Sequence, residues 1–205
     1  LAVDEQDSPH HADLADADDL AGMPVVVADL HSALPAVLAG IRSTHPHARV
    51  AYVMTDGGAL PAAFSRAVAG LADAGWLAST ITVGQAFGGD HEAVTTHTGL
   101  LAARFVVGAD VAVVTQGPGN VGTGTRWGYS GVGCADALHA AEVLGGHGIA
   151  SLRVSGADLR ERHRGISHHS RTAYGRALLT AADVPVTTLP DAELDALVRE
   201  QLRTL

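Results

Sequence analysis

The fold is indicated by Ala109-Asp110-Val111-Ala112-Val113-Val114-Thr115, an apolar run that leads directly into the glycine-rich segment Gln116–Arg126. A continuous run of β-branched and small apolar residues is typical of a parallel strand buried on both faces, whereas a half-exposed strand alternates. The run Val25-Val26-Val27 has the same character. We therefore expect both runs to lie inside a parallel sheet.

Six apolar runs of this kind alternate with longer segments that have helical spacing. The pattern predicts an α/β fold with a doubly wound, mostly parallel, Rossmann-like six-stranded sheet and helices on both faces. The expected strands are 25–28, 50–54, 77–83, 111–115, 149–154 and 184–188. The expected helices are 32–42, 61–74, 92–107, 131–144, 168–182 and 191–202.

The chain has 205 residues and 47% hydrophobic residues, which is enough for one substantial core. We expect an acidic lead-in or linker over 1–23 and a single α/β domain over 24–205. No apolar run reaches the ~20 residues that span a bilayer, so we expect a soluble protein without a membrane partner. The single Cys134 excludes an internal disulfide and suits a reducing cytoplasm, where we expect the protein to reside.

Charge limits the partners and the chemistry. A net charge of -9 argues against nucleic acid, whose binders concentrate positive charge on one face. All 13 basic residues are arginine, which excludes a Schiff-base lysine and a phosphate-binding lysine of the P-loop type. The expected partner is a small anionic molecule, and a homo-oligomer is compatible with the sequence.

The glycine-rich segment is the first candidate site because it follows a strand end, where open α/β sheets bind ligands. Its backbone amides and guanidinium suit an oxyanion. The expected ligand-binding residues are Gln116, Gly117, Gly119, Asn120, Gly122, Thr123, Gly124, Thr125 and Arg126. The pattern G-x-G-x-x-G occurs, but it follows the fourth strand and lacks the ribose-binding acid, so we do not expect NAD. The alternative is a turn that permits close packing.

Two aspartates follow other strands and are candidate catalytic residues. Asp56 precedes Gly57 and Gly58, which leave the backbone open to a ligand, and Asp90 precedes the segment that contains His97. Either aspartate has a structural alternative, because aspartate also favours turns and helix N-caps. Asp90 as the cap of that helix is the stronger interpretation.

His168 and His169 are further candidate catalytic residues, at an expected helix start that Ser167 caps. Nearby arginines and the helix N-terminus disfavour protonation, so a neutral base is expected there. As neighbours on a helix, the two side chains should point in different directions. A divalent metal held by Asp29, Asp56, Asp90 and His168 stays open, but no metal is identified, and a solvated basic helix end is the alternative.

Three longer motifs resemble one known family. They are Val83–Asp90, Gln116–Gly128 and Arg162–His169, and they are similar to an uncharacterised bacterial family, domain of unknown function 3866, over nearly the whole chain. The resemblance implies an additional β-rich segment before Leu1 and supplies no activity or catalytic residues.

These features together predict a small-molecule-binding α/β domain. We expect an enzyme of transferase or hydrolase type that acts on an anionic, nucleotide-like or sugar-like ligand held by the loop 116–126. In this interpretation an aspartate orients a hydroxyl or a metal, and a histidine moves a proton. The alternative is a non-catalytic sensor or assembly domain whose loop docks a protein partner.

Overall fold

A parallel six-stranded sheet forms the centre of the molecule in the computed structural model, which describes residues 2–58 and 60–205. Its strands are β1 (Pro24–Ala28), β2 (Val50–Thr55), β3 (Ser79–Val83), β4 (His91–Ala93), β5 (Val111–Gln116) and β6 (His147–Ser151). They are ordered β4-β3-β2-β5-β1-β6, and every adjacent pair is parallel. The predicted parallel α/β architecture is confirmed.

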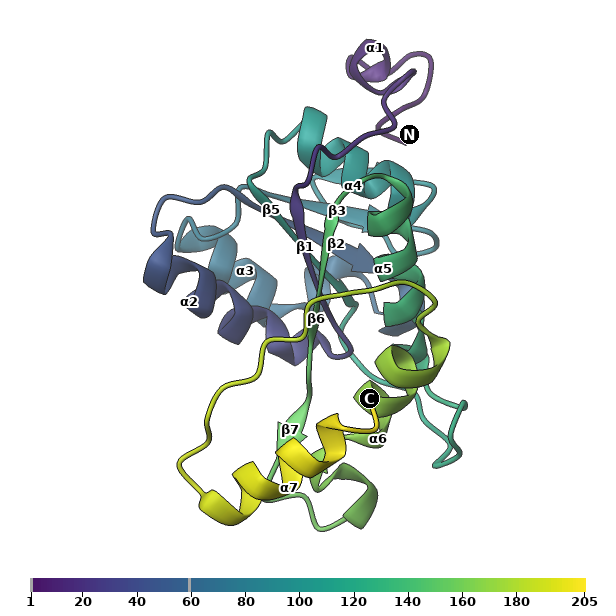
Figure 1. Cartoon of the computed structure of the whole chain (residues 1–205). Coiled ribbons are helices and arrows are strands. Elements are labelled where there is room, and N and C mark those ends of the chain that lie inside the picture. Colours follow the sequence, from purple (N-terminus) through teal and green to yellow (C-terminus); the bar gives the residue numbers. More distant parts are fainter. Residues whose placement is uncertain (1, 59) are drawn as a thin grey trace.

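Helices cover both faces of the sheet (Figure 1). α2 (Leu34–Thr44) and α3 (Arg66–Asp73) lie on one face, and α4 (Thr96–Phe105) and α5 (Cys134–Val143) lie on the other. The described residues also form α1 (His11–Leu14), α6 (His168–Thr172) and α7 (Ala192–Leu202), which lie beyond the ends of the strands. A π-helical turn, Ala173–Ala177, continues α6, and β7 (Val154–Ser155) pairs with β8 (Gly165–Ile166) in a small antiparallel sheet. Among the described residues, no helix has the length and apolar character needed to cross a bilayer.

Alternation along the central strand explains the two layers. Ala112 and Val114 of β5 join one core cluster with α4 and α5, whereas Val113 joins another with α2 and α3. All three residues are at most 1% exposed. Because both faces are buried, every residue of the run must be apolar, which is why its sequence shows no alternation.

One predicted strand is wrong, and another strand takes its place. Residues 184–188 are not a strand; only Asp183 bridges to Ile149 beside β6. The sixth strand is β4 instead, which forms the edge of the sheet opposite β6 and pairs with Ile81–Val83 of β3. The connection between these strands packs closely against the backbone of β3. A Cβ atom at Gly89 would lie 2.9–3.0 Å from backbone atoms of Thr80, Thr82 and His91. Glycine is therefore required at this crossing.

Helix boundaries also differ from the prediction in three places. The helix expected over 61–74 begins only at Arg66, after a 3-10 turn at Ala62–Phe64, and Ser65 caps it. The helix expected over 92–107 begins only at Thr96, because the residues before it form β4, and Thr95 rather than Asp90 caps it by accepting a bond from the Thr98 amide. The helix expected over 168–182 ends with the π-helical turn, and the chain leaves it at Leu178.

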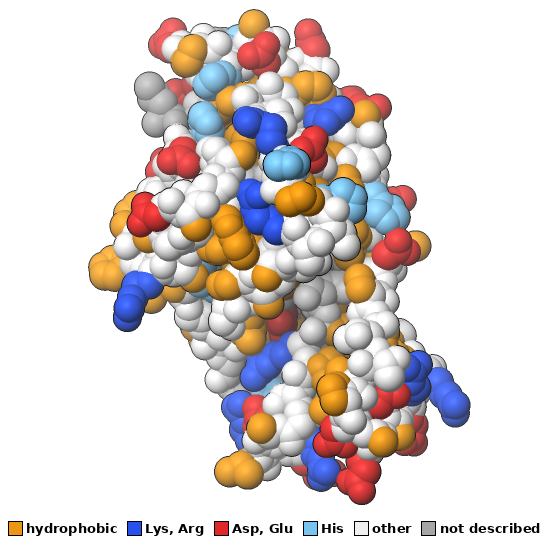
Figure 2. Space-filling view, turned by 90° about the vertical axis from the view of Figure 1, so that its left-hand side faces the viewer, with side chains coloured by type: hydrophobic (Ala, Val, Ile, Leu, Met, Phe, Trp, Pro, Cys, Tyr) orange, Lys and Arg blue, Asp and Glu red, His pale blue; other side chains and the backbone are white. Residues whose placement is uncertain are grey.

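The C-terminal segment lies beyond the carboxyl ends of the strands. In Figure 1, β6 leads downwards to β7, and α6 and α7 lie below the sheet. The space-filling view shows this part as a lower lobe with arginine and carboxylate side chains side by side on its surface (Figure 2). At the opposite end, the lead-in is partly packed, since Leu20 is fully buried and its amide donates to the Leu144 carbonyl. The C-terminal segment therefore lies over the carboxyl ends of the strands, and the lead-in packs at their amino ends.

Candidate functional site

A buried carboxylate marks the carboxyl end of β1. Asp29 follows β1 directly and is 2% exposed, and its Oδ2 has no hydrogen-bond partner among the described residues. Burial raises the pKa of Asp29 to about 6, although the nearby Arg153 guanidinium opposes the shift. An unpaired buried carboxylate costs free energy, and such groups recur at functional sites.

A cavity of about 210 Å³ adjoins Asp29 between the ends of β1 and β6. Its lining residues are Ala28, Asp29, Leu30, Ser32, Ala33, Ser151, Leu152, Arg153 and Val154. The lining thus includes one acid, one arginine and two serines. Crevices outside the carboxyl ends of parallel strands are the usual ligand sites of open α/β sheets.

The base of the glycine-rich loop is fixed against Asp29. Gln116 Nε2 donates to the Asp29 carbonyl at 2.8 Å and to Asn120 Oδ1 at 3.1 Å. Ser130 Oγ also donates to Asn120 Oδ1, at 3.1 Å, and accepts from the Val121 amide. The predicted residues Gln116 and Asn120 therefore hold the loop in place next to β1.

Beyond this base, the loop forms an exposed arm. Gly122 bridges to Tyr129 in antiparallel fashion, and the Thr123 amide donates to the Gly128 carbonyl at 2.8 Å. Thr125 Oγ1 accepts from the Gly128 amide, and Arg126 is exposed near the tip. Several polar groups of the predicted anion cradle are thus already engaged within the chain.

The Asp56 loop packs against the start of the glycine-rich loop. A Cβ atom at Gly58 would overlap the Gly117 carbonyl, and one at Gly57 would lie 3.0 Å from Gln116 Oε1, so these glycines permit close backbone approach. Asp56 Oδ2 accepts from the Gln85 amide at 2.9 Å. Asp56 also lines a separate cavity of about 390 Å³ with Leu60, Pro61, Gln85, Ala86 and Phe87.

Asp90 lies away from the carboxyl edge, contrary to the prediction from the strand pattern. Its Oδ2 accepts from the Thr80 amide at 2.8 Å, from Thr80 Oγ1 at 2.9 Å and from Ser79 Oγ at 3.2 Å. Ser79 and Thr80 are the first residues of β3. Because β4 is parallel to β3, the connection between the two strands runs back along β3 and brings Asp90 next to these residues. Asp90 therefore fixes this connection, far along β3 from the strand's carboxyl end.

A buried chain of polar side chains runs beneath the carboxyl edge. His31 Nε2 lies 2.6 Å from Ser65 Oγ, and its Nδ1 lies 2.9 Å from the Tyr52 hydroxyl. The same hydroxyl lies 2.8 Å from Thr115 Oγ1. Burial lowers the pKa of His31, so the imidazole is neutral and can accept one bond and donate another. These hydrogen bonds connect β2 and β5 to Ser65, the N-cap residue of α3.

Three histidines meet at the start of α6. The ring centroids of His168 and His169 are 4.4 Å apart, and those of His163 lie 4.9 and 5.0 Å from them. The two neighbours thus do not point apart as predicted. They occupy the first helical turn, where no preceding turn fills the space, so both rings can turn towards His163.

Burial and arginines keep these imidazoles neutral. Burial, followed by Arg153 and Arg160, lowers the pKa of His163 to about 4. Burial lowers the pKa of His169 to about 4 as well, and it lowers that of His168, with Arg162 as the next cause. At neutral pH each ring is therefore in the form that accepts a proton or binds a metal ion.

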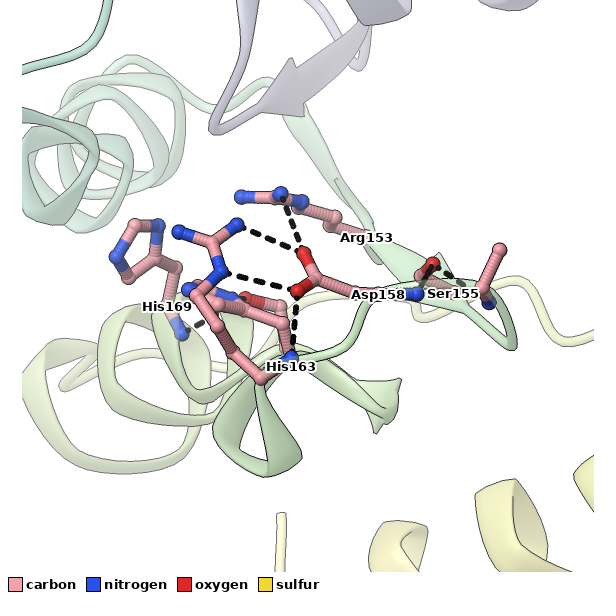
Figure 3. Close-up of polar contacts among 8 residues, drawn as sticks. Arg153, Ser155, Asp158, His163 and His169 are labelled. Carbon is pink, nitrogen blue, oxygen red and sulfur yellow. Dashed lines mark hydrogen bonds and ion pairs between the residues drawn. The ribbon is translucent and has the colours of Figure 1, made fainter.

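Asp158 organises the arginines beside the cluster (Figure 3). Its carboxylate accepts from Arg160 Nε at 2.9 Å and Arg160 Nη2 at 2.8 Å, and it lies 3.7 Å from Arg153 Nη2. The hydrogen bonds from Arg160 lower the pKa of Asp158. Arg153 lines the cavity beside Asp29 and also lies next to Asp158, which bonds to Arg160.

The comparison with family models decides the relationship of this chain. A model described as "Protein of unknown function (DUF3866)" matches residues 1–205. The chain belongs to the DUF3866 family. Neither the search of curated proteins nor the search of solved structures found a match.

For this DUF3866 chain, sequence reasoning found two members of the histidine cluster and missed the third. His163 looked like part of an arginine-rich segment, and its only signal was its spacing of five residues before His168. Arg153 was likewise missed because it lies in the short connection between β6 and β7 and belongs to no motif. Asp29 was considered as a metal ligand and not as an isolated buried acid.

A larger hollow of the DUF3866 chain lies at the other end of the sheet. It measures about 820 Å³ and its lining is mainly apolar, with Pro24, Val26, Gly40, Ile41, Thr44, His45, Pro46, His47, Ala48, Asp110, Val111 and Ile149. No buried acid, arginine or histidine cluster occurs in that lining. Convergent polar groups, rather than volume, identify a site where chemistry takes place, and these groups are at the carboxyl edge.

Proposed function

We propose that this DUF3866 chain is an enzyme of transferase or hydrolase type that binds a small anionic, nucleotide-like or sugar-like ligand at the carboxyl ends of β1 and β6. The observation that carries the proposal is the buried Asp29, whose unpaired Oδ2 belongs to the wall of a cavity that also contains Arg153. A carboxyl group with a pKa of about 6 can exchange a proton near neutral pH.

Each polar group has a distinct role in this proposal. Arg153 binds the anionic part of the ligand, since a guanidinium matches phosphate and carboxylate geometry. Asp29 orients a ligand hydroxyl or takes its proton. His168, which is half-buried and neutral, is the second proton carrier when no metal ion is bound to it. Arg126, exposed on the arm, contacts the part of the ligand that extends outside the cavity.

A thermal-shift screen tests the proposal with nucleotides, sugar phosphates and inorganic phosphate. A ligand at 100 times its Kd stabilises the folded state by about 2.7 kcal/mol, or about 5–10 °C for a chain of this size. We expect one ligand class to raise the Tm of the wild type and of Arg66→Gln, an exposed control, but not of Arg153→Gln. A shift that survives Arg153→Gln unchanged, or the absence of any shift, contradicts the proposal.

The exposed arm favours one alternative, a sensor or assembly domain that docks a protein. Val121 and Trp127 of the arm are 62% and 54% exposed, and exposed apolar side chains are typical of interaction surfaces. A second copy of the chain is the simplest partner. Sedimentation velocity of wild type and Trp127→Ser tests it: a dimer that the substitution converts to monomer supports docking, and a monomeric wild type excludes self-docking.

A further inference from the structure

We propose that His163, His168 and His169 together bind one divalent transition-metal ion. One ring nitrogen from each residue lies within 4.8 Å of the other two. Two further observations indicate a missing partner: His168 Nε2 and His169 Nδ1 are buried, and neither has a hydrogen bond among the described residues. Buried ring nitrogens normally have partners, so two free ones in one cluster require an explanation.

The spacing of the rings suits a shared ion. Imidazoles that bind one ion at about 2.1 Å place their ring centroids about 5 Å apart and their donor atoms about 3.4 Å apart. The observed centroid distances of 4.4, 4.9 and 5.0 Å agree with the first value. The donor atoms lie within 4.8 Å of one another, so binding of one ion requires at most a modest approach of the three rings.

Neighbouring groups already hold two of the rings. Tyr129 stacks on His169 with centroids 4.0 Å apart and planes 2° from parallel, and its hydroxyl donates to the His169 carbonyl at 2.7 Å. His163 Nδ1 lies 2.8 Å from Ser167 Oγ. When Nδ1 donates to that oxygen, Nε2 is free to bind a metal, which is the usual arrangement around metal-bound histidine.

The donor set defines the class of metal. Three imidazoles select Zn²⁺, Co²⁺, Ni²⁺ or Cu²⁺ over Mg²⁺ and Ca²⁺, which prefer oxygen ligands. Three protein ligands leave a fourth position open to water or a ligand, as in catalytic zinc sites. Arg153, Arg160 and Arg162 surround the cluster and disfavour a bare cation, although Asp158 pairs with the first two. Their charge favours an anionic oxygen at the open position.

The inference goes beyond the proposed function, because metal binding requires no organic ligand. The test is a Co²⁺ titration of chelator-treated full chain without an affinity tag, followed by visible absorption and calorimetry. We expect one equivalent of Co²⁺ with d–d bands of a low-coordinate nitrogen site, displaced by Zn²⁺. Even the loss of a group that supports a metal ligand typically weakens binding 10–100-fold, so His168→Gln, which removes a ligand, should weaken it by about 100-fold or more.

Two further variants make the titration decisive. His91→Gln is the matched control, because His91 belongs to another close histidine pair, in which its ring centroid lies 5.5 Å from that of His10. This change should leave the titration unchanged. His168→Cys should restore tight binding and add a thiolate charge-transfer band, which separates loss of a ligand from loss of structure. Weak, non-stoichiometric Co²⁺ binding, or equal binding by His168→Gln, overturns the inference.

The two proposals fail in different experiments. Arg153→Gln should abolish the shift with anionic ligands yet retain stoichiometric Co²⁺. If instead the metal site is absent, chelator-treated wild type still responds to its anionic ligand and no Co²⁺ spectrum appears.

Discussion

Asp29→Asn should stabilise the folded protein at neutral pH. The pKa of this carboxyl is raised from 3.8 to about 6, chiefly by burial, so the folded state resists its ionisation. A shift of about two units corresponds to about 3 kcal/mol between the charged and the neutral form. Asparagine keeps the shape without the charge. We expect a gain of about 1–3 kcal/mol at pH 7.5, since the new amide also needs partners.

The sign of the pH dependence follows from the same shift. Between pH 4 and pH 6 the folded wild type binds more protons at Asp29 than the unfolded chain, so its free energy of unfolding falls as pH rises through this window. The gain in the free energy of unfolding from Asp29→Asn, relative to wild type, should therefore be smallest near pH 4, increase up to pH 6 and stay constant above about pH 7.

Urea unfolding at pH 4, 5, 6 and 7.5 measures this dependence. Asp16→Asn is the matched control, because Asp16 is exposed in the lead-in, and its effect should be small at every pH. A stability difference between Asp29→Asn and wild type that is the same at pH 4 and pH 7.5 would refute the reasoning. So would a variant that is less stable than wild type throughout. A gain in stability with a loss of ligand binding would indicate a carboxylate retained for function.

Two other predictions concern packing and reactivity. Gly89→Ala should destabilise the fold by about 1–3 kcal/mol in urea unfolding, because the added Cβ would press on the backbone of β3. The control is Gly40→Ala inside α2, where nothing lies within 4 Å of the added Cβ, and it should stabilise the fold by up to about 1 kcal/mol. Equal effects of the two substitutions would contradict the close packing of Gly89 against β3. Cys134, which is 7% exposed and has a pKa raised by burial, should react with a disulfide reagent only after unfolding, and fast labelling of the native protein would contradict its place in the core.

The histidine cluster shows how far sequence reasoning reached into the site. His168 and His169 stood out because they follow a capping serine in an arginine-rich segment. Between them and His163 lies Gly165, whose φ of +70° is a backbone conformation that favours glycine. Spacing alone could not show how the backbone passes from His163 to His168. For Asp90 the sequence pattern predicted the wrong position, since the fold brings its carboxylate to Thr80 at the start of β3 and not to the end of that strand.

The sequence by itself determined the α/β class and most of the elements. Val111–Gln116 and Pro24–Ala28 were evident because a strand buried on both faces is mainly a continuous apolar run, and this requirement is local. Tertiary structure decided the strand order, in which β5 lies between β1 and β2. It also decided β4, whose sequence His91-Glu92-Ala93 has little strand character and becomes a strand only by pairing with β3. The environment of Asp29 has the same origin: its pKa and its cavity arise from residues distant in the sequence that the fold brings around it.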